Sequence, residues 1–199
     1  MIISHKYKFI FIKTQKTAGS SIEKILLNHL GQEDIFAGMP LENIPGQNCE
    51  NIYEHCDWKT IKELDQDAWK NYYKFTIERN SWDKVVSLYW FFNKYYPSKV
   101  KKGFERFVAK PKNYRADWEL YTDNDKVIVD KVIQYDTMHT EFKEVCNLLS
   151  IPYNDELNKV KMKSGLRKTS NYQEMYNEVT KQQVFELYKK PIQYYNYSF

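Results

Sequence analysis

Residues 7–31 read YKFIFIKTQKTAGSSIEKILLNHLG, and this stretch decides the fold class of the 199-residue chain. It opens on a nearly continuous apolar run, Tyr7–Lys13, which is typical of a strand buried on both faces of a parallel sheet. A polar turn over Thr14–Gly19 follows. From residue 20 the apolar spacing becomes helical, with one face formed by Ile22, Ile25, Leu26 and Leu30. The stretch therefore predicts a strand–loop–helix unit.

Strand and helix signals alternate along the rest of the chain. Tyr73–Ile77 has the alternation of a second strand, and Val127–Tyr135 has the β-propensity of a third. Helices are expected at 58–64 after an Asp57 N-cap, at 82–95, at 104–108, from Thr137 or Thr140 onward, and at 180–189. This order predicts an α/β fold with a central parallel sheet flanked by helices on both faces. No repeat or biased linker divides the chain, so residues 1–199 are expected to form a single domain.

The composition excludes several classes of protein. With 42% hydrophobic and 17% aromatic residues and only 6 Gly and 6 Pro, the chain is not disordered, collagenous or of low complexity. The net charge of +4, from 30 basic and 26 acidic residues, is too mild for a nucleic-acid binder but is compatible with a small anionic ligand.

The chain also lacks targeting signals. No run approaches the roughly 20 apolar residues of a membrane span, and no signal region precedes the first strand. Three cysteines make a disulfide framework improbable and favour a reducing compartment. We therefore expect a cytoplasmic protein without a membrane partner, although removal of an N-terminal anchor would leave the same sequence.

The first loop has the features of an anion site. Backbone N–H groups of a loop and of a helix N-terminus attract negative charge. Gly19 allows close backbone approach, Ser20 and Ser21 can cap the helix and donate to an oxyanion, and Lys16 adds a point charge. The loop does not match the nucleotide-binding pattern G-x-x-x-x-G-K-[ST], because its first Gly is absent and its Lys precedes the Gly. An ordinary helix start remains the alternative.

A second candidate site follows the second strand. Arg79 comes at the carboxyl end of that strand, where open α/β sheets bind ligands, and its planar guanidinium matches a phosphate. Ser87 follows eight residues later on the next helix. The alternative is that Arg79 pairs with Glu78 or Asp83 and that Ser87 has no role.

Together, KTAGSS after the first strand and ERNSWDKVVSLY after a later one resemble the sulfotransferase superfamily, which uses 3′-phosphoadenosine 5′-phosphosulfate (PAPS). Within it, the motifs resemble the carbohydrate branch similar to heparan sulfate 2-O-sulfotransferase. The resemblance implies a P-loop-like fold, PAPS as donor and 3′-phosphoadenosine 5′-phosphate (PAP) as product, and this chemistry requires no metal. The sequence departs from the family pattern at two positions. Ser81 stands where Pro is usual, and Glu78 stands where an apolar residue is usual. The Glu78 carboxylate could weaken the binding of an anionic donor.

The resemblance also implies roles for individual residues. The 5′-phosphosulfate would be held by the loop residues Lys16, Thr17, Ala18, Gly19, Ser20 and Ser21. Lys16 would contact the bridging oxygen and take part in catalysis, while Arg79 and Ser87 would bind the 3′-phosphate. In the family a late loop closes over the adenosine and the 3′-phosphate, and within residues 161–171 Arg167 and Lys168 are the candidates here.

The family carries its catalytic base in the region of His55, which is therefore the candidate base, with Glu54 and Asp57 as alternatives. A zinc site of Cys49, His55 and Cys56 is the competing interpretation. It offers three ligands at most, and its spacing fits none of the usual zinc patterns.

These observations predict a sulfotransferase that moves the sulfuryl group of PAPS to an acceptor hydroxyl by in-line displacement. A carbohydrate is the favoured acceptor, and the basic, aromatic segment 94–115, with Tyr95, Tyr96, Phe104 and Tyr114, is its candidate surface. Two alternatives remain: a P-loop-like small-molecule kinase, which would need ATP and Mg²⁺, and a module that binds a nucleotide or polyanion without turnover. The sequence fixes neither the acceptor's identity nor the oligomeric state.

Overall fold

The computed structural model describes residues 1–38, 44–114, 116–160, 165–169 and 171–199. The chain forms two compact units. The first unit contains residues 1–78 and 119–162, and the second contains residues 79–118 and 163–199. Each unit has its own hydrophobic core, and each is described by itself below.

The first unit is built on a six-stranded sheet with the strand order β4-β3-β1-β2-β5-β8. Its strands, in chain order, are β1 (Ile2–Ser4), β2 (Phe9–Ile12), β3 (Ile35–Phe36), β4 (Gln47–Asn48), β5 (Tyr73–Glu78) and β8 (Lys131–Gln134). β2, β5 and β8 run parallel to one another, and β3 and β4 are parallel. β1 alone runs antiparallel to both of its neighbours. The centre of the sheet is therefore parallel, as the buried apolar run predicted.

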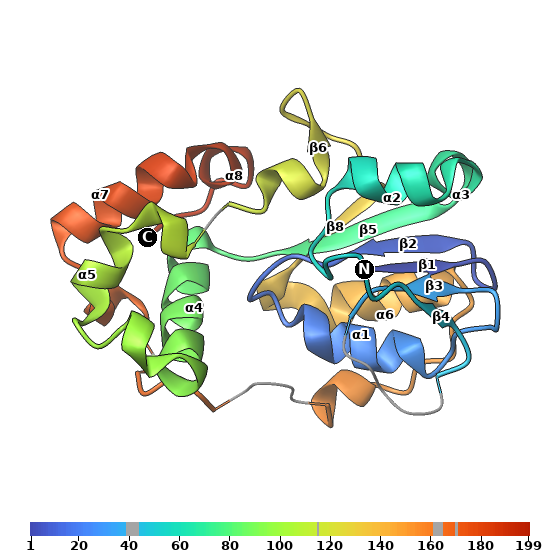
Figure 1. The fold of residues 1–199 in the computed structure, drawn as a ribbon, viewed down its shortest axis with the longest axis horizontal. Coiled ribbons are helices and arrows are strands. Elements are labelled where there is room, and N and C mark those ends of the chain that lie inside the picture. Colours follow the sequence, from blue (N-terminus) through green and yellow to red (C-terminus); the bar gives the residue numbers. More distant parts are fainter. Residues whose placement is uncertain (39–43, 115, 161–164, 170) are drawn as a thin grey trace. The chain divides into compact units, whose positions relative to one another are not determined.

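Helices cover both faces of this sheet (Figure 1). α1 (Gly19–Leu27) and α6 (Met138–Leu148) lie on one face, and α2 (Trp58–Leu64) and α3 (Gln66–Asn71) lie on the other. Under α1 and α6 the rings of Phe11 and Phe75 stack with their centroids 5.2 Å apart. The α/β class with helices on both faces is thus confirmed.

One predicted strand divides in two. Residues 127–135 contain the end of β7 (Lys126–Val127) and the whole of β8, and β7 pairs antiparallel with β6 (Thr122–Asp123) outside the main sheet. Asn124 and Asp125 both have positive φ, at 46° and 63°. A two-residue turn of this type closes a hairpin, so β7 joins that hairpin and only β8 enters the sheet.

The second unit is helical. α4 (Ser81–Tyr95) follows Asn80, whose side chain accepts a hydrogen bond from the Trp82 N–H at 3.1 Å. Its core is shared with α5 (Phe104–Val108), α7 (Glu178–Leu187) and α8 (Lys189–Tyr194). α7 begins two residues earlier than the apolar pattern indicated, because Asn177 and Thr180 form a capping box. Short 3₁₀ turns of this unit occupy Pro97–Lys99, Pro111–Asn113 and Gln173–Met175. Those of the first unit occupy Tyr135–Thr137 and Glu156–Asn158, and Trp118–Leu120 lies where the chain passes from the second unit to the first.

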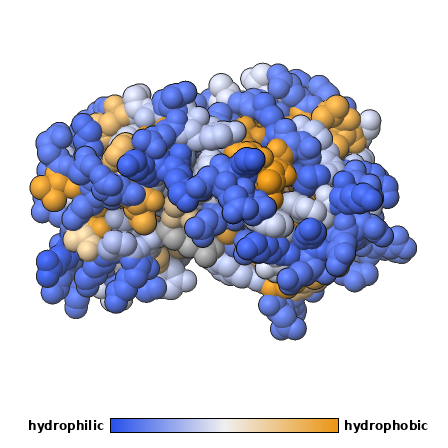
Figure 2. Space-filling model, turned by 90° about the horizontal axis from the view of Figure 1, so that it is seen from above, coloured by the Kyte–Doolittle hydropathy of each residue, from blue (hydrophilic) through white to orange (hydrophobic). Residues whose placement is uncertain are grey.

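Hydrophilic residues cover most of the face drawn in Figure 2. Among the described residues, no helix combines the length and the apolar character that crossing a bilayer would require.

Candidate active site

The loop between β2 and α1 has an unusual backbone. Lys16 and Ala18 both lie in the left-handed region, with φ of 58° and 64°, although neither is glycine. Each such residue costs about 1–3 kcal/mol, a strain that persists where the surroundings enforce it and that is frequent at ligand sites. Left-handed residues in a tight loop turn successive N–H groups toward a common concavity that suits an anion. The loop geometry therefore agrees with the anion site expected from the sequence.

Two buried threonine side chains, Thr14 and Thr17, form hydrogen bonds that hold this loop in place. The Thr14 hydroxyl donates to the carbonyl of Ile77 on β5, and it lies 2.9 Å from the hydroxyl of Thr17. Thr17 also reaches the carbonyl of Thr14 at 3.3 Å and is fully buried. The Thr17 side chain is thus part of the scaffold, so only its backbone can meet a donor molecule. The structural role of Thr14 was not predicted from the sequence.

The helix start differs from the expectation that Ser20 and Ser21 cap α1. The N-cap is Ala18, without a side-chain hydrogen bond, and both serines lie in the first helical turn. The Ala18 carbonyl accepts the Ser21 N–H at 2.8 Å, so the left-handed residue brings the chain into the helix before the serines are reached. At Gly19, a Cβ would lie 3.0 Å from Cγ of Lys13, so the lysine stem occupies the space of a side chain there.

His55 precedes α2 and lies against the end of β2. Its Nδ1 is 2.9 Å from the carbonyl oxygen of Lys13. Since a carbonyl can only accept, Nδ1 carries the hydrogen and Nε2 carries the lone pair. Burial lowers the pKa of His55 to about 4, even though the Lys13 carbonyl and the Glu54 carboxylate act in the opposite direction. The imidazole is therefore a neutral base at pH 7, with Nε2 as the basic atom.

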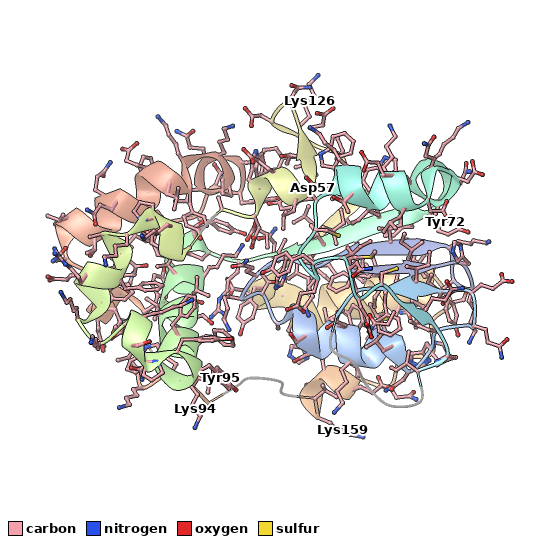
Figure 3. The ribbon with its side chains drawn as sticks, in the orientation of Figure 1. Asp57, Tyr72, Lys94, Tyr95, Lys126 and Lys159 are labelled. Carbon is pink, nitrogen blue, oxygen red and sulfur yellow. The ribbon has the colours of Figure 1, made fainter. Side chains whose placement is uncertain are left out.

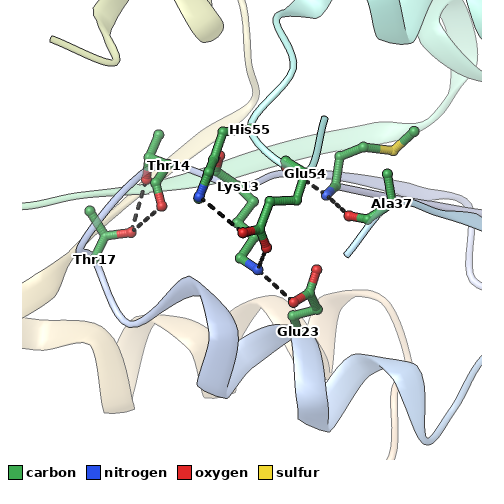
Figure 4. A network of polar contacts seen from close by, with 8 residues as sticks. Lys13, Thr14, Thr17, Glu23, Ala37, Glu54 and His55 are labelled. Carbon is green, nitrogen blue, oxygen red and sulfur yellow. Dashed lines mark hydrogen bonds and ion pairs between the residues drawn. The ribbon is translucent and has the colours of Figure 1, made fainter. Parts of the chain in front are cut away.

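A buried ionic network lies beside this histidine (Figure 4). The Lys13 ammonium is 2.6 Å from Oε2 of Glu23 on α1, and it also pairs with Oε2 of Glu54. Lys13 and Glu23 are almost fully buried. This network was not predicted from the sequence. The available signal was a lysine ending an apolar run and a glutamate inside the apolar part of a helix.

The alternative bases are engaged otherwise. Asp57 caps α2, with Oδ1 accepting from both the N–H and the hydroxyl of Thr60 at 2.9 Å. Glu54 is paired with Lys13. These contacts of Asp57 and Glu54 favour His55 over either carboxylate as the base.

Across the described ranges, no group of three or more His, Cys, Asp and Glu residues could hold a metal ion.

In the second unit, two arginines share one carboxylate. Nε and Nη2 of Arg79 lie 2.6 Å and 2.5 Å from Oδ2 of Asp83, and Nη2 of Arg167 pairs with Oδ1. The pairing of Arg79 with Asp83, left open by the sequence, therefore exists, and it also brings Arg167 to the same point. Two guanidiniums with one carboxylate keep a net positive charge, which suits a phosphate.

The remaining predicted residues of this unit lie nearby. On α4, Ser87 and Trp90 follow Asp83 by four and seven residues, so the three share a helix face. Lys168 places its ammonium 5.8 Å from the centroid of the Trp90 ring. Trp90 Nε1 and the Thr169 hydroxyl are buried without a hydrogen-bond partner in the described part of the chain. Such groups normally have a partner, so both are suited to a bound ligand.

The two departures from the family motif have local explanations. Glu78 is buried, and its Oε2 accepts a hydrogen bond from the Tyr121 hydroxyl at 2.8 Å. Ser81 is the first residue of α4, a position at which proline is also favoured. Neither residue disrupts the strand or the helix that it joins.

The structure thus collects the predicted residues in two groups. The first unit holds the loop 16–21 and His55, and the second unit holds Arg79, Ser87, Arg167 and Lys168. The additional residues that sequence reasoning missed are Lys13, Thr14, Glu23 and Trp90, while Asp83 was seen only as an alternative partner of Arg79.

Comparisons with known proteins bear on the fold and the family of the chain. A stretch of 99 residues, 48% of this chain, is 30% identical to an uncharacterised protein of Archaeoglobus fulgidus and covers 82% of it. The fold is similar to the crystal structure of mouse sulfotransferase SULT7A1 complexed with PAP, with a TM-score of 0.57 and 14% identity over 93% of this chain and 83% of that one. The family model for the sulfotransferase family matches residues 1–198. The chain therefore belongs to the sulfotransferase family, the superfamily that its two motifs resemble.

Proposed function

We propose that this enzyme transfers the sulfuryl group of PAPS to a hydroxyl group of a carbohydrate. The observation that carries the proposal is His55, an imidazole of 13% exposure that is neutral at pH 7 and holds its lone pair on Nε2. An acceptor hydroxyl must lose a proton when it attacks sulfur, and a positioned base accelerates this step about 10²- to 10⁴-fold. PAPS use is supported by the family and by the PAP-bound state of the structural relative.

Separate groups of residues would hold the two charged ends of the donor. The strained loop of the first unit would hold the phosphosulfate, with Lys16 and backbone N–H groups as its contacts. Arg79, Ser87, Arg167 and Lys168 of the second unit would bind the 3′-phosphate. The shared carboxylate of Asp83 orients Arg79 and Arg167 before the ligand arrives, which lowers the entropic cost of binding.

The reaction follows from these assignments. The acceptor oxygen forms a bond to sulfur while the bond between sulfur and the bridging oxygen breaks, and PAP leaves with the electron pair. His55 takes the acceptor proton at Nε2. Charge grows on the bridging oxygen only as the bond breaks, so a cation there stabilises the transition state more than the ground state. Lys16 is proposed for that role.

The carbohydrate acceptor is supported by one surface of the second unit. Lys94 and Tyr95 extend from the end of α4 (Figure 3), and Tyr95 and Tyr96 are about half exposed, at 50% and 48%. The Lys99 ammonium lies 5.1 Å from the centroids of Phe92 and Tyr96. Aromatic faces and ammonium groups together suit an acidic sugar.

Two other aromatics of the segment are core residues and not surface ones. Phe104 and Tyr114 are buried, and the Tyr114 hydroxyl donates to the Val108 carbonyl at 2.6 Å. The expectation that they belong to an acceptor surface is therefore wrong, because their rings complete the core around α5. Arg115 lies outside the described residues.

Transfer of ³⁵S from labelled PAPS to a panel of neutral sugars, acidic oligosaccharides and simple alcohols tests this function. We expect label in the acidic oligosaccharides above all. Label confined to simple alcohols would contradict the carbohydrate assignment, and no transfer to any acceptor, with PAP still bound, would favour the non-catalytic module.

Arg79→Ala is expected to raise the dissociation constant of PAP about 10- to 100-fold, because a charge-assisted hydrogen bond contributes about 1.5–3 kcal/mol. Isothermal titration with PAP measures this effect. Arg106→Ala, which removes an exposed arginine of α5, is the matched control and should bind as the parent does. Equal affinity in the Arg79 variant and the parent would remove this residue from the donor site.

The pH dependence of transfer follows from the depressed pKa of His55. The base is active when unprotonated, so kcat/KM should stay level as the pH falls below 6.5 and should decline only as it approaches about 4. Initial rates between pH 4 and pH 8 measure this profile. A decline centred near pH 6.5 would mean that the base is an ordinary exposed histidine and not His55.

A further inference from the structure

The buried lysine beside the candidate base has no part in the mechanism so far. Lys13 directly follows β2, its side chain is 2% exposed, and its ammonium lies between the carboxylates of Glu23 and Glu54. Oε1 of Glu23 has no hydrogen-bond partner among the described residues. One ammonium thus faces two carboxylates at low exposure and holds both of them in place.

The Glu54 carboxylate also approaches His55. Oε1 of Glu54 lies 3.6 Å from Nε2 of His55, the atom that holds the lone pair in the neutral imidazole. While the imidazole is neutral, the carboxylate gains nothing from this approach. Once Nε2 takes a proton, the two form an ion pair. The contact is therefore more favourable in the protonated state, which is the state formed during transfer.

We propose that Glu54, held in place by Lys13, is a positioning residue that stabilises the imidazolium of His55 as it accepts the acceptor's proton. This inference rests on the proposed function, in which His55 is the base. Glu54 acts through His55 and touches neither donor nor acceptor. Lys13 has two roles. Its backbone carbonyl fixes the Nδ1–H tautomer of His55, and its ammonium fixes the position of the Glu54 carboxylate.

Further groups also face His55. The Tyr53 ring meets the imidazole edge-on at 5.4 Å. The amine of Met1 donates to the carbonyls of Ala37 and Glu54, and burial lowers its pKa to about 6. This amine is therefore largely neutral at pH 7, where transfer is measured. It becomes cationic below pH 6, where its charge opposes protonation of His55 and cannot replace the Glu54 carboxylate.

The chain offers a matched pair of variants. Glu54→Gln and Glu23→Gln each remove one carboxylate charge from the same ammonium, and Glu23 is the more buried of the two. Of these two carboxylates, that of Glu54 lies 3.6 Å from Nε2 of His55. If the network merely supports the fold, Glu23→Gln should lower kcat at least as much as Glu54→Gln does. If Glu54 positions the base, Glu54→Gln alone should change the chemistry of the imidazole.

The first measurement needs neither donor nor acceptor. Nitrogen-15 NMR of the His55 imidazole from pH 8 to pH 3.5 reports its tautomer and its protonation. We expect the Nδ1–H tautomer in all three proteins, protonation near pH 4 in the parent and in Glu23→Gln, and a neutral imidazole down to pH 3.5 in Glu54→Gln. Protonation of Glu54→Gln at the same pH as the parent would overturn the inference.

The second measurement uses transfer from PAPS at pH 7. Glu54→Gln should lower kcat about 10-fold with an unchanged KM for PAPS, and Glu23→Gln should keep at least half of the parent's kcat. Glu54→Asp, which keeps the charge but shortens its reach, should recover part of the loss and replaces Glu54→Gln if that variant does not fold. Equal kcat in the Glu54 and Glu23 variants would overturn the positioning role, whereas a parent that transfers nothing would overturn the proposed function itself.

Discussion

Lys16→Ala is expected to lower kcat about 10²- to 10³-fold while the dissociation constant of PAP stays close to that of the parent. Removing one group that stabilises a developing oxyanion costs about this much in other enzymes. The charge on the bridging oxygen appears only as the bond to sulfur breaks, so a lysine there acts mainly in the transition state. Single-turnover rates with PAPS and isothermal titration with PAP separate the two effects.

The backbone conformation at Lys16 does not favour the parent over the Lys16→Ala variant. Lys16 has φ of 58°, and alanine meets the same left-handed strain as lysine, so the substitution removes the ammonium without changing the cost of the loop. Lys24→Ala, at an exposed position of α1, is the control and should retain the parent's rate. A loss of PAP affinity as large as the loss of kcat would assign Lys16 to ground-state binding.

His55→Ala is expected to reduce sulfuryl transfer about 10²- to 10⁴-fold at pH 7 and to leave PAP binding intact. The reason is geometric: the Lys13 carbonyl holds Nδ1–H, so the residue presents Nε2 as the acceptor of the proton. Rates with PAPS and the best acceptor, together with PAP titration, measure both quantities. His139→Ala, an exposed histidine of α6, is the matched control.

The outcome of His55→Ala also decides between the candidate bases. Full activity would move the base to Glu54, since Asp57 is occupied as the cap of α2. Loss of both transfer and PAP binding would instead show that the substitution collapses the loop through Lys13. Only a loss of transfer with PAP binding intact supports His55 as the base.

Local signals predicted the fold well. Apolar runs at 7–13 and 73–77 became the parallel neighbours β2 and β5, and Asp57 caps the helix that it precedes. These features depend on periodicity and on side-chain chemistry within a few residues. The division of the third strand was missed, because the turn at Asn124 and Asp125 determines where β7 pairs, and β-propensity does not encode pairing.

The candidate site was predictable only in part. The loop 16–21 and the position of Arg79 follow from motifs that are contiguous in sequence. By contrast, Arg167 reaches Asp83 across 84 residues, and Lys13 meets Glu54 across 41. Sequence patterns do not report such distant pairings. The apparent serine caps were misread for a related reason, since the left-handed Ala18 starts the helix earlier than side-chain preference indicates.

The most direct test of the central claim, that the donor is PAPS, is a thermal shift with PAP against ADP and 5′-AMP at matched concentration. A ligand at 100 times its dissociation constant stabilises a protein by about 2.7 kcal/mol, which raises Tm by about 5–10 °C for a chain of this size. We predict such a shift with PAP and little or none with ADP or AMP, because only PAP carries the 3′-phosphate. Equal shifts with PAP and ADP, or a shift with ADP alone, would contradict the assignment and favour a kinase.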